Sequence, residues 1–228
     1  MRSRALRAIA TRQPFRVLQA PLLNVVKATP RYVVIDKPPG LLSVQGKGEA
    51  NKDCAAARLR ECFPGATGPL VVHRLDMDTS GLLVFGLDAE AQRELSMQFE
   101  RREVEKRYVA LVEGVMRAER GEIDIPIRMD PDNRPVQVVD HVHGKASVTR
   151  WRLLAVETDR SRVELEPLTG RTHQLRVHMA QVGHAIVGDV LYGGAERGAG
   201  RLMLHAAMLE FREPGTEVRR RFESRAGF

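Results

Sequence analysis

Short apolar runs separated by glycine, proline and polar residues dominate this chain and predict mainly β-structure. The runs are rich in valine, isoleucine, leucine and aromatic residues, which favour strands. They predict strands at 31–36, 41–44, 69–72, 82–87, 105–112, 121–127, 136–139, 146–156, 162–165, 202–211 and 218–222. Because short loops join many of these runs, we expect neighbouring strands to be antiparallel.

Three stretches carry apolar residues at helical spacing instead. Asp88 is a suitable N-cap for the second stretch, because its carboxylate can accept hydrogen bonds from the free amides of a first helical turn. The predicted helices span 52–63, 89–102 and 173–182. Many strands with few helices indicate an α+β domain with a mixed, mostly antiparallel central sheet and flanking helices.

The third predicted helix carries both an apolar stripe and charged residues. Thr172 is placed to cap its start, and Gly183 is placed to end it. The apolar stripe consists of Leu175, Met179 and Val182. Arg176 lies roughly 100° around the helix from Leu175, on the face of Thr172 and His173. Taken alone, such an arginine is most simply an exposed residue of the helix surface.

Length and composition fit one globular domain. The chain has 228 residues, of which 43% are hydrophobic and 29% charged, as is ordinary for a soluble protein. No apolar run reaches membrane-spanning length. Cys54 and Cys62 match no metal-binding spacing and no disulfide framework, so we expect a reduced, cytoplasmic protein. Without a repeat or a long linker, residues 21–228 are predicted to form one domain, which we expect to be a monomer.

The charge of the chain favours a nucleic-acid partner but is unevenly distributed. The net charge is +7 and the sequence pI is near 9.9. Of 36 basic residues, five are arginines within residues 1–20, which hold no acid; the other 31 are nearly balanced by 29 acidic residues. This basic N-terminal extension is compatible with a solvated tail, an arm that contacts RNA phosphates, or a mitochondrial presequence.

The loop at 73–81 is a polar segment between two apolar runs. It reads His-Arg-Leu-Asp-Met-Asp-Thr-Ser-Gly. An unpaired charge in a core is very costly, so the loop must lie at the end of a sheet and face a cleft. The simplest interpretation is a polar connection in which Arg74 pairs with Asp76 or Asp78. Clefts at sheet ends are also where active sites are usually found.

Several motifs stand out when the chain is taken in order. They are Lys-Pro-Pro-Gly-Leu at 37–41, His-Arg-Leu-Asp at 73–76, Thr-Ser-Gly-Leu at 79–82, Lys-Arg-Tyr at 106–108 and Gly-Arg-Thr-His-Gln-Leu-Arg-Val-His at 170–178. Together they resemble the RluA family of pseudouridine synthases, over roughly residues 31–215. The resemblance implies that family's catalytic fold, an RNA-binding cleft across the sheet, and isomerisation of uridine to pseudouridine in structured RNA without a cofactor or metal.

The resemblance implies three catalytic residues. Asp76 would be the nucleophile, as carboxylates are in other glycosidic chemistry. Arg176, the arginine after Gln-Leu, would be the cation that keeps this carboxylate charged. Tyr108 would stack on the target uracil and could take part in proton transfer. Without the resemblance, Tyr108 would be interpreted as a half-buried strand aromatic.

The same resemblance implies RNA contacts around these residues. Arg74 could bind a phosphate or stack in the place of a flipped nucleotide. The other residues expected to contact RNA are His73, Lys106, Arg171 and His173. The residues before position 31 are too few for the S4 RNA-binding domain that many family members carry. In this respect the chain resembles members that modify a uridine in large-subunit ribosomal RNA and one in tRNA anticodon stem-loops.

Two other functions fit parts of the sequence. A non-catalytic RNA-binding or ribosome-assembly protein could retain the same fold, although intact Asp76, Tyr108 and Arg176 argue against it. A small glycosidase could use Asp76 and Asp78 as a carboxylate pair. It would need aromatic residues to bind sugar, yet aromatic residues make up only 5% of the chain.

Overall fold

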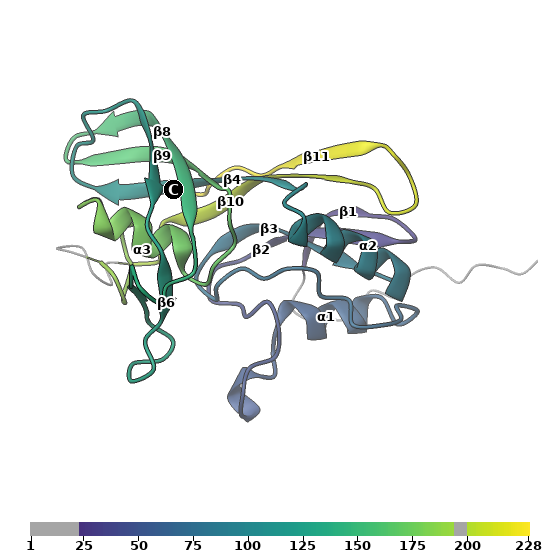
Figure 1. The fold of residues 1–228 in the computed structure, drawn as a ribbon. Helices are drawn as coiled ribbons and strands as arrows, with labels where there is room; N and C mark the ends of the chain where they lie inside the picture. The colour runs from purple at the N-terminus through teal and green to yellow at the C-terminus, as the bar shows by residue number, and fades with distance from the viewer. Residues whose placement is uncertain (1–22, 194–199) are drawn as a thin grey trace, which may run out of the picture.

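The computed structural model describes residues 23–193 and 200–228, so the N-terminal extension 1–20 lies outside the described residues. Figure 1 shows a large twisted sheet with helices packed against it. The helices are α1 (Ala55–Cys62), α2 (Ala89–Glu100) and α3 (Gln174–Gln181), with a 3-10 turn at Glu49–Asn51. The strands are β1 (Asn24–Ala28), β2 (Tyr32–Lys37), β3 (Ser80–Gly86), β4 (Glu105–Glu113), β5 (Arg120–Asp124), β6 (Ile127–Met129), β7 (Gln137–Val139), β8 (Val148–Glu157), β9 (Arg160–Pro167), β10 (Leu204–Arg212) and β11 (Arg219–Glu223).

Within the described residues, nine strands form one sheet. Their order is β1-β2-β3-β10-β4-β9-β8-β5, and β11 pairs with β10. The strand pairs of this sheet are antiparallel, except that β3 and β10 run parallel. Strands β6 and β7 form a separate antiparallel ribbon. The predicted α+β class with a mixed, mostly antiparallel sheet is confirmed.

The sheet has two halves that meet where β3 pairs with β10, a junction that we call the seam. Pairing at the seam covers two residue pairs, His205 with Ser80 and Ala206 with Gly81. The first half contains β1 to β3 with α1 and α2, and the second half contains β10, β4, β9, β8 and β5 with α3 (Figure 1). Gly81 has φ +111°, and a Cβ there would collide with the carbonyl oxygen of Ala206. Only glycine therefore allows the strands to approach so closely.

The alternation of side chains along the strands builds a core on each face of the first half. Leu83 and Phe85 pack in one core with Leu59 of α1. Val84 packs in another with Leu95 of α2. In the second half, α3 covers one face. The core there includes Val112, Val163, Leu165, Leu175 and Met179.

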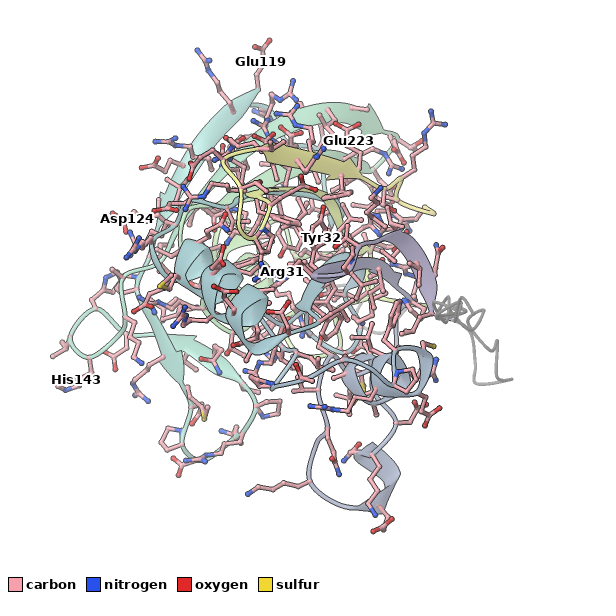
Figure 2. All side chains as sticks on the ribbon, turned by 90° about the vertical axis from the view of Figure 1, so that its right-hand side faces the viewer. Arg31, Tyr32, Glu119, Asp124, His143 and Glu223 are labelled. Atoms are coloured by element: carbon pink, nitrogen blue, oxygen red, sulfur yellow. The ribbon has the colours of Figure 1, made fainter. Side chains whose placement is uncertain are left out.

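Arg31, which precedes β2, connects the sheet with α2. Its Nε lies 2.8 Å from the carboxylate of Asp88, and its Nη2 lies 3.0 Å from that of Glu90. Asp88 is also the N-cap of α2, as predicted, because it accepts a hydrogen bond from the amide of Ala91 at 2.8 Å. Figure 2 shows Arg31 beside Tyr32 at this helix. Local capping and a tertiary ion pair thus use the same carboxylate.

Two predicted strands, 41–44 and 69–72, make only isolated β-bridges. In the second segment, Pro69 has no amide hydrogen and Leu70 has φ +62°, so a regular ladder cannot form. The segment still lies along β3, because Val71 forms a β-bridge with that strand. The apolar run predicted its burial correctly and its backbone conformation wrongly.

Helix α3 differs from its prediction at its start and on its surface. It begins after His173, which has φ 54° and makes no side-chain cap, so the prediction of Thr172 as N-cap is wrong. Val182 is 40% exposed rather than part of the apolar stripe, whereas Arg176 is 3% exposed. Residues 174–179 are all buried, because the helix packs on several sides.

The end of α3 agrees with its prediction, since Gly183 follows it with φ +84°. The predicted strand 121–127 is divided into β5 and β6. None of the helices among the described residues is long and apolar enough to cross a membrane.

Candidate active site

Asp76 lies in the loop before β3, and its neighbours in the chain are fixed through their backbone. The hydroxyl of Ser43 accepts a hydrogen bond from the amide of Leu75 at 3.0 Å and donates one to the Leu75 carbonyl oxygen at 2.7 Å. The carbonyl oxygen of Met77 accepts from the amide of Gly40 at 2.9 Å. The loop is thus held on both sides, while 27% of the Asp76 side chain remains exposed.

Lys37 fixes the same loop. It belongs to the motif at 37–41, but no role was predicted for it from the sequence. Its side chain is completely buried. The ammonium donates to three backbone carbonyl oxygens, one of which is that of Met77 at 2.8 Å. Burial lowers the pKa of Lys37 to about 8, although the charges of Asp78 and Asp76 oppose the decrease. The ammonium is therefore mostly charged at neutral pH. The available signal was a lysine that ends an apolar strand.

Arg176 faces Asp76 from the other half of the sheet. Its Nη1 lies 3.7 Å from Oδ2 of Asp76, whereas its Nε and Nη2 each donate to Asp189 at 2.7 Å. Burial alone would lower the pKa of Arg176, but Asp189 and Asp76 raise that pKa overall. Burial would raise the pKa of Asp189, yet Arg176 lowers it. The pair is therefore ionised, and its two parallel hydrogen bonds fix the orientation of the guanidinium.

Asp189 is a site residue that was not identified from the sequence. It follows the buried apolar residues 185–187. Its Oδ1 also accepts from the amides of Leu191 and Tyr192, at 2.9 and 3.0 Å. A lone carboxylate in such an apolar run needs a buried partner, and this was the signal that could have identified it.

His173 and Tyr192 form a further side of the site. Nε2 of His173 lies 3.9 Å from Oδ1 of Asp76, and Nδ1 lies 2.7 Å from the Tyr192 hydroxyl. That hydroxyl accepts from the amide of Gln137 at 2.7 Å, so its own proton can go to Nδ1 and leave the ring proton on Nε2, towards Asp76. Burial lowers the pKa of His173, with Asp76 opposing the decrease. The guanidinium of Arg176 lies 5.2 Å from the centre of the Tyr192 ring.

Tyr108 lies on β4 and packs against cores on both sides of the seam. Burial and the charge of Asp76 raise the pKa of its hydroxyl, so the phenol keeps its proton at neutral pH. Lys106, two residues earlier, points to the same face of the sheet. Burial and the charge of Arg102 lower the pKa of Lys106. The structure thus brings Asp76, Tyr108 and Arg176 to one place.

The remaining residues that were predicted to contact RNA lie in two environments. Arg74 and Arg171 are exposed. His73 is engaged in the packing of the protein, where its ring stacks on Phe99 with centroids 4.3 Å apart and its Nε2 accepts from the amide of Val84 at 3.2 Å. Burial lowers the pKa of His73 to about 3, so the ring is neutral at physiological pH.

Comparison with known proteins matches this site to a family. A family model described as RNA pseudouridylate synthase matches residues 31–181. The chain is 44% identical over 200 residues to the dual-specificity RNA pseudouridine synthase RluA of Pasteurella multocida, which covers 86% of this chain and 90% of that protein. It is 42% identical over 213 residues to the protein of the same name from Escherichia coli strain K12, with 92% and 96% covered.

Two solved human structures have a similar fold. RNA Pseudouridylate Synthase Domain Containing 1 superposes with a TM-score of 0.72 at 30% identity, covering 89% of this chain and 84% of that one. RNA Pseudouridylate Synthase Domain Containing 4 gives a TM-score of 0.73 at 26% identity, covering 89% and 88%. The chain belongs to the RNA pseudouridylate synthase family of isomerases.

Proposed function

We propose that this chain converts specific uridines of structured RNA to pseudouridine with Asp76 as the nucleophile. Arg176 acts as its counter-ion and Tyr108 as the platform for the uracil. One observation carries the proposal: the partly exposed carboxylate of Asp76 lies 3.7 Å from a guanidinium whose other nitrogens are committed to Asp189. A charged carboxylate and its counter-ion are thus placed together before substrate binds.

The reaction retains every atom of the uridine. The bond between N1 of uracil and C1′ of ribose breaks, the uracil turns, and a bond between C5 and C1′ forms. The proton on C5 is lost and N1 gains one. No oxidant, reductant or water is consumed, so the protein has to supply a nucleophile, a counter-charge and a surface that holds the base.

The position of Arg176 favours attack by an ionised Asp76. Two opposite unit charges about 4 Å apart attract each other by about 4 kcal/mol where the effective dielectric constant is near 20. Substrate that covers the exposed part of Asp76 would displace water and strengthen this attraction. Because Asp189 holds two nitrogens of Arg176, little reorganisation is needed during the reaction.

Tyr108 is suited to stack on the target uracil. It could also transfer a proton once Asp76 has lost its charge. The target uridine has to leave its stack to be reached, and an aromatic ring can replace the stacking that the base gives up. While Asp76 is charged, the raised pKa of Tyr108 keeps the phenol protonated. A covalent bond to Asp76 would remove that charge and make transfer of the phenolic proton easier.

We propose large-subunit ribosomal RNA and tRNA anticodon stem-loops as the substrates. The relatives named as dual-specificity enzymes are matched over nearly their whole length, which supports two RNA classes for this chain. The exposed Arg74 and Arg171 are suited to contact phosphates, which position an RNA without specifying its sequence. His173, whose Nε2 lies 3.9 Å from Asp76, and Lys106, on the same face of β4 as Tyr108, are proposed to contact the flipped nucleotide.

Residues 21–228 are proposed to form the catalytic domain, and the basic extension 1–20 is proposed to neutralise RNA phosphates. We propose that the domain acts as a cytoplasmic monomer without a cofactor. The free thiols of Cys54 and Cys62 support a reducing compartment.

Pseudouridine mapping in a strain that lacks this gene tests the proposal. We expect specific uridines of ribosomal RNA and tRNA to remain unmodified, and the wild-type gene to restore them. A gene that carries Asp76→Asn should not restore them. Restoration by Asp76→Asn would remove Asp76 from the reaction, and an unchanged modification pattern in the deletion strain would refute the proposed substrates.

A further inference from the structure

A line of hydrogen bonds crosses the seam beside the active site. Nη2 of Arg201 donates to Oγ of Ser80 at 2.6 Å, and this oxygen lies 2.8 Å from Nδ1 of His205. On the other side of the ring, Nε2 of His205 lies 3.1 Å from Oγ of Ser224. Ser224 in turn donates to Oδ2 of Asp36 at 2.5 Å. We call these five residues the seam chain.

The hydrogen bonds of the seam chain can all run in one direction. Since Ser224 donates to Asp36, its oxygen can accept from Nε2–H of His205. Nδ1 of His205 then accepts from Ser80, whose oxygen accepts from Arg201. This arrangement needs a neutral imidazole, and burial lowers the pKa of His205, with Asp36 opposing the decrease. The seam chain therefore leads from the guanidinium of Arg201 to the carboxylate of Asp36, and each hydrogen bond polarises the next.

The seam divides the active site. Asp76 comes from the loop that leads into Ser80 on the first half, whereas Tyr108 and Arg176 come from the second half. Strand pairing across the seam is limited to two residue pairs, so pairing alone gives weak control over the spacing of the halves. The seam chain adds side-chain hydrogen bonds at the same place, and both Ser80 and His205 are buried.

A separate set of contacts joins the two halves at the other end of β10. Gln98 of α2 donates to the carbonyl oxygen of Arg212 at 2.9 Å and accepts from its amide at 2.8 Å. Tyr32 packs edge-on against Phe211, with ring centroids 5.3 Å apart. These contacts hold the halves together without the seam chain. Disruption of the seam chain should therefore change the spacing near Asp76 without unfolding the protein.

We propose that Ser224 and Asp36 are positioning residues that set the spacing between Asp76 and Arg176 through Ser80 and His205. Neither acts on the substrate itself. This proposal rests on the proposed roles of Asp76 and Arg176. It makes the segment after β11 part of the machinery that aligns the active site, although that segment supplies none of the proposed catalytic residues.

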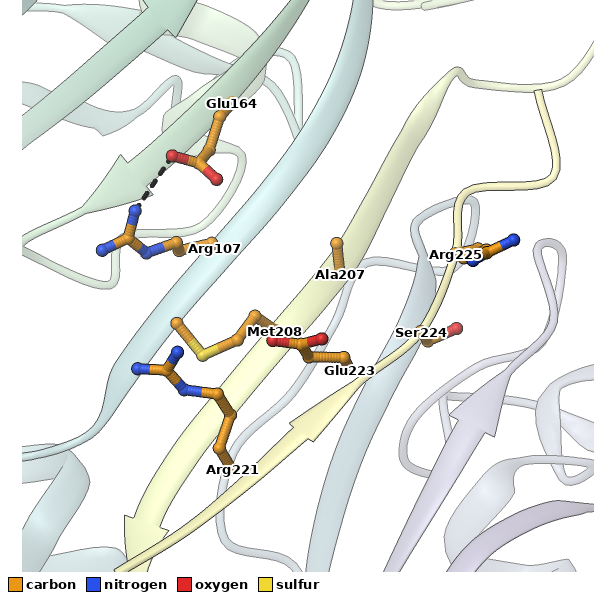
Figure 3. Close-up of a pocket in the computed structure, with 8 residues that line it drawn as sticks. All are labelled: Arg107, Glu164, Ala207, Met208, Arg221, Glu223, Ser224 and Arg225. Carbon is orange, nitrogen blue, oxygen red and sulfur yellow. Dashed lines mark hydrogen bonds and ion pairs between the residues drawn. The ribbon is translucent and has the colours of Figure 1, made fainter. Parts of the chain in front are cut away.

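Ser224 is the member of the seam chain that is best suited to substitution. It lines a cavity of about 530 Å³ together with Arg107 and Arg225 (Figure 3). Arg107 precedes Tyr108 on β4, so this cavity opens on the sheet face opposite Tyr108. An added methyl group at Ser224 therefore has open space, and removal of the hydroxyl leaves the pairing of β11 unchanged.

The test compares Ser224→Ala with Ser224→Thr, which keeps the hydroxyl. Single-turnover rates of pseudouridine formation, RNA dissociation constants and melting temperatures are measured on a stem-loop that the wild-type chain modifies. We expect Ser224→Ala to lower the rate roughly ten-fold through misalignment, with RNA affinity unchanged, and Ser224→Thr to keep the wild-type rate. Asp36→Asn weakens the last hydrogen bond of the seam chain and should also lower the rate.

Gln98→Ala is the matched control, because it removes hydrogen bonds between the halves at the end away from the site. It should lower the melting temperature and leave the rate unchanged. A wild-type rate for Ser224→Ala, an equal decrease in Ser224→Thr, or a decrease in affinity in place of rate would overturn the inference. A wild-type chain that forms no pseudouridine would instead refute the proposed function, so the two failures can be distinguished.

Discussion

The two halves of the sheet hold their active-site residues in different ways. In the first half α1 and α2 cover the two faces around β3, so every residue of this strand is buried. In the second half α3 covers one face, and β9 alternates buried with half-buried positions. The loop of Asp76 is anchored through its backbone to a body covered on both sides. Arg176, in contrast, depends on one buried ion pair with Asp189.

This difference predicts how substitutions in each half would affect activity and stability. Ser43 and Lys37 contact the Asp76 loop through its backbone, so the position of the loop depends on several hydrogen bonds. None of these hydrogen bonds uses the Asp76 carboxylate. Control of Arg176 is concentrated in Asp189, and a buried charge without its partner is strongly destabilising. Substitutions of the Arg176–Asp189 pair should therefore lower activity and stability together. Single substitutions among the contacts of the Asp76 loop should each cause a smaller decrease.

Apart from loss of the nucleophile itself, the largest effect is expected for Arg176→Ala. Removal of the counter-ion should lower the single-turnover rate by roughly 10²–10³-fold. The free energy of unfolding should fall by about 3–5 kcal/mol, because Asp189 stays buried without its partner. Arg176→Lys should recover part of the rate, since it restores charge but not the two parallel hydrogen bonds.

Denaturant titrations and single-turnover assays measure the two consequences of Arg176→Ala separately. Replacing both members of the pair, with Arg176→Met and Asp189→Leu, should regain stability but not activity. A near-wild-type rate for Arg176→Ala would show that the second half does not supply the counter-ion.

An intermediate effect is expected for Lys37→Met, which keeps the length of the side chain and removes its donors. The rate should fall roughly ten-fold as the Asp76 loop loosens. Stability should fall by about 1–3 kcal/mol, since carbonyl oxygens such as that of Met77 are deprived of a buried donor. Lys52→Met is the matched control, because Lys52 is exposed, and it should change neither quantity. An unchanged rate for Lys37→Met would mean that the other contacts suffice to hold the loop.

A smaller effect concerns stability in acid and the packing of the first half. Burial lowers the pKa of His73 from 6.5 to about 3. Between these values the unfolded chain binds a proton at His73 that the folded chain does not, so stability falls as pH falls through this window. His73→Gln keeps an acceptor for the amide of Val84 and does not titrate. Its stability, measured by urea unfolding from pH 7 to pH 4, should depend less on pH than that of the wild type. If the stability of both proteins changed with pH in the same way, His73 would not be the cause of the loss of stability in acid.

The smallest effect on rate is expected for deletion of residues 1–20, which lie outside the described residues. Every phosphate that the extension neutralises adds about 0.7–0.9 to the salt slope of RNA binding, so the deletion should flatten that slope. Affinity should fall, while the modified position and the saturating rate stay the same. Titration of a stem-loop at several salt concentrations, with product mapping, measures both. A shifted modification site would mean that the extension selects the substrate.

Local signals in the sequence predicted much of the fold. Capping predicted the start of α2 at Asp88, and short apolar runs rich in β-branched and aromatic residues predicted most strands. The apolar run 69–72 was predicted as a strand because apolar content does not report the positive φ of Leu70. The prediction of Thr172 as the N-cap of α3 was wrong because the helix begins one residue later, after His173. His173 adopts a left-handed conformation, at a backbone cost of about 1–3 kcal/mol.

The site was less predictable where it depends on tertiary contacts. Motifs pointed to Asp76 and Arg176, and the structure brings them together. Asp189 lies in an irregular turn, so its ion pair with Arg176 has no local pattern. The hydrogen bonds of Ser43 to the Asp76 loop join positions 32 residues apart, and periodicity carries no information about such pairs.

Single-turnover formation of pseudouridine by Asp76→Asn tests the role of Asp76 most directly. The substitution keeps the shape of the side chain and removes its charge and most of its nucleophilicity, while the hydrogen bonds that hold the loop do not involve the Asp76 side chain. We predict no detectable pseudouridine on a stem-loop that the wild-type chain modifies, with RNA affinity largely retained. Appreciable single-turnover formation of pseudouridine by Asp76→Asn would contradict this mechanism.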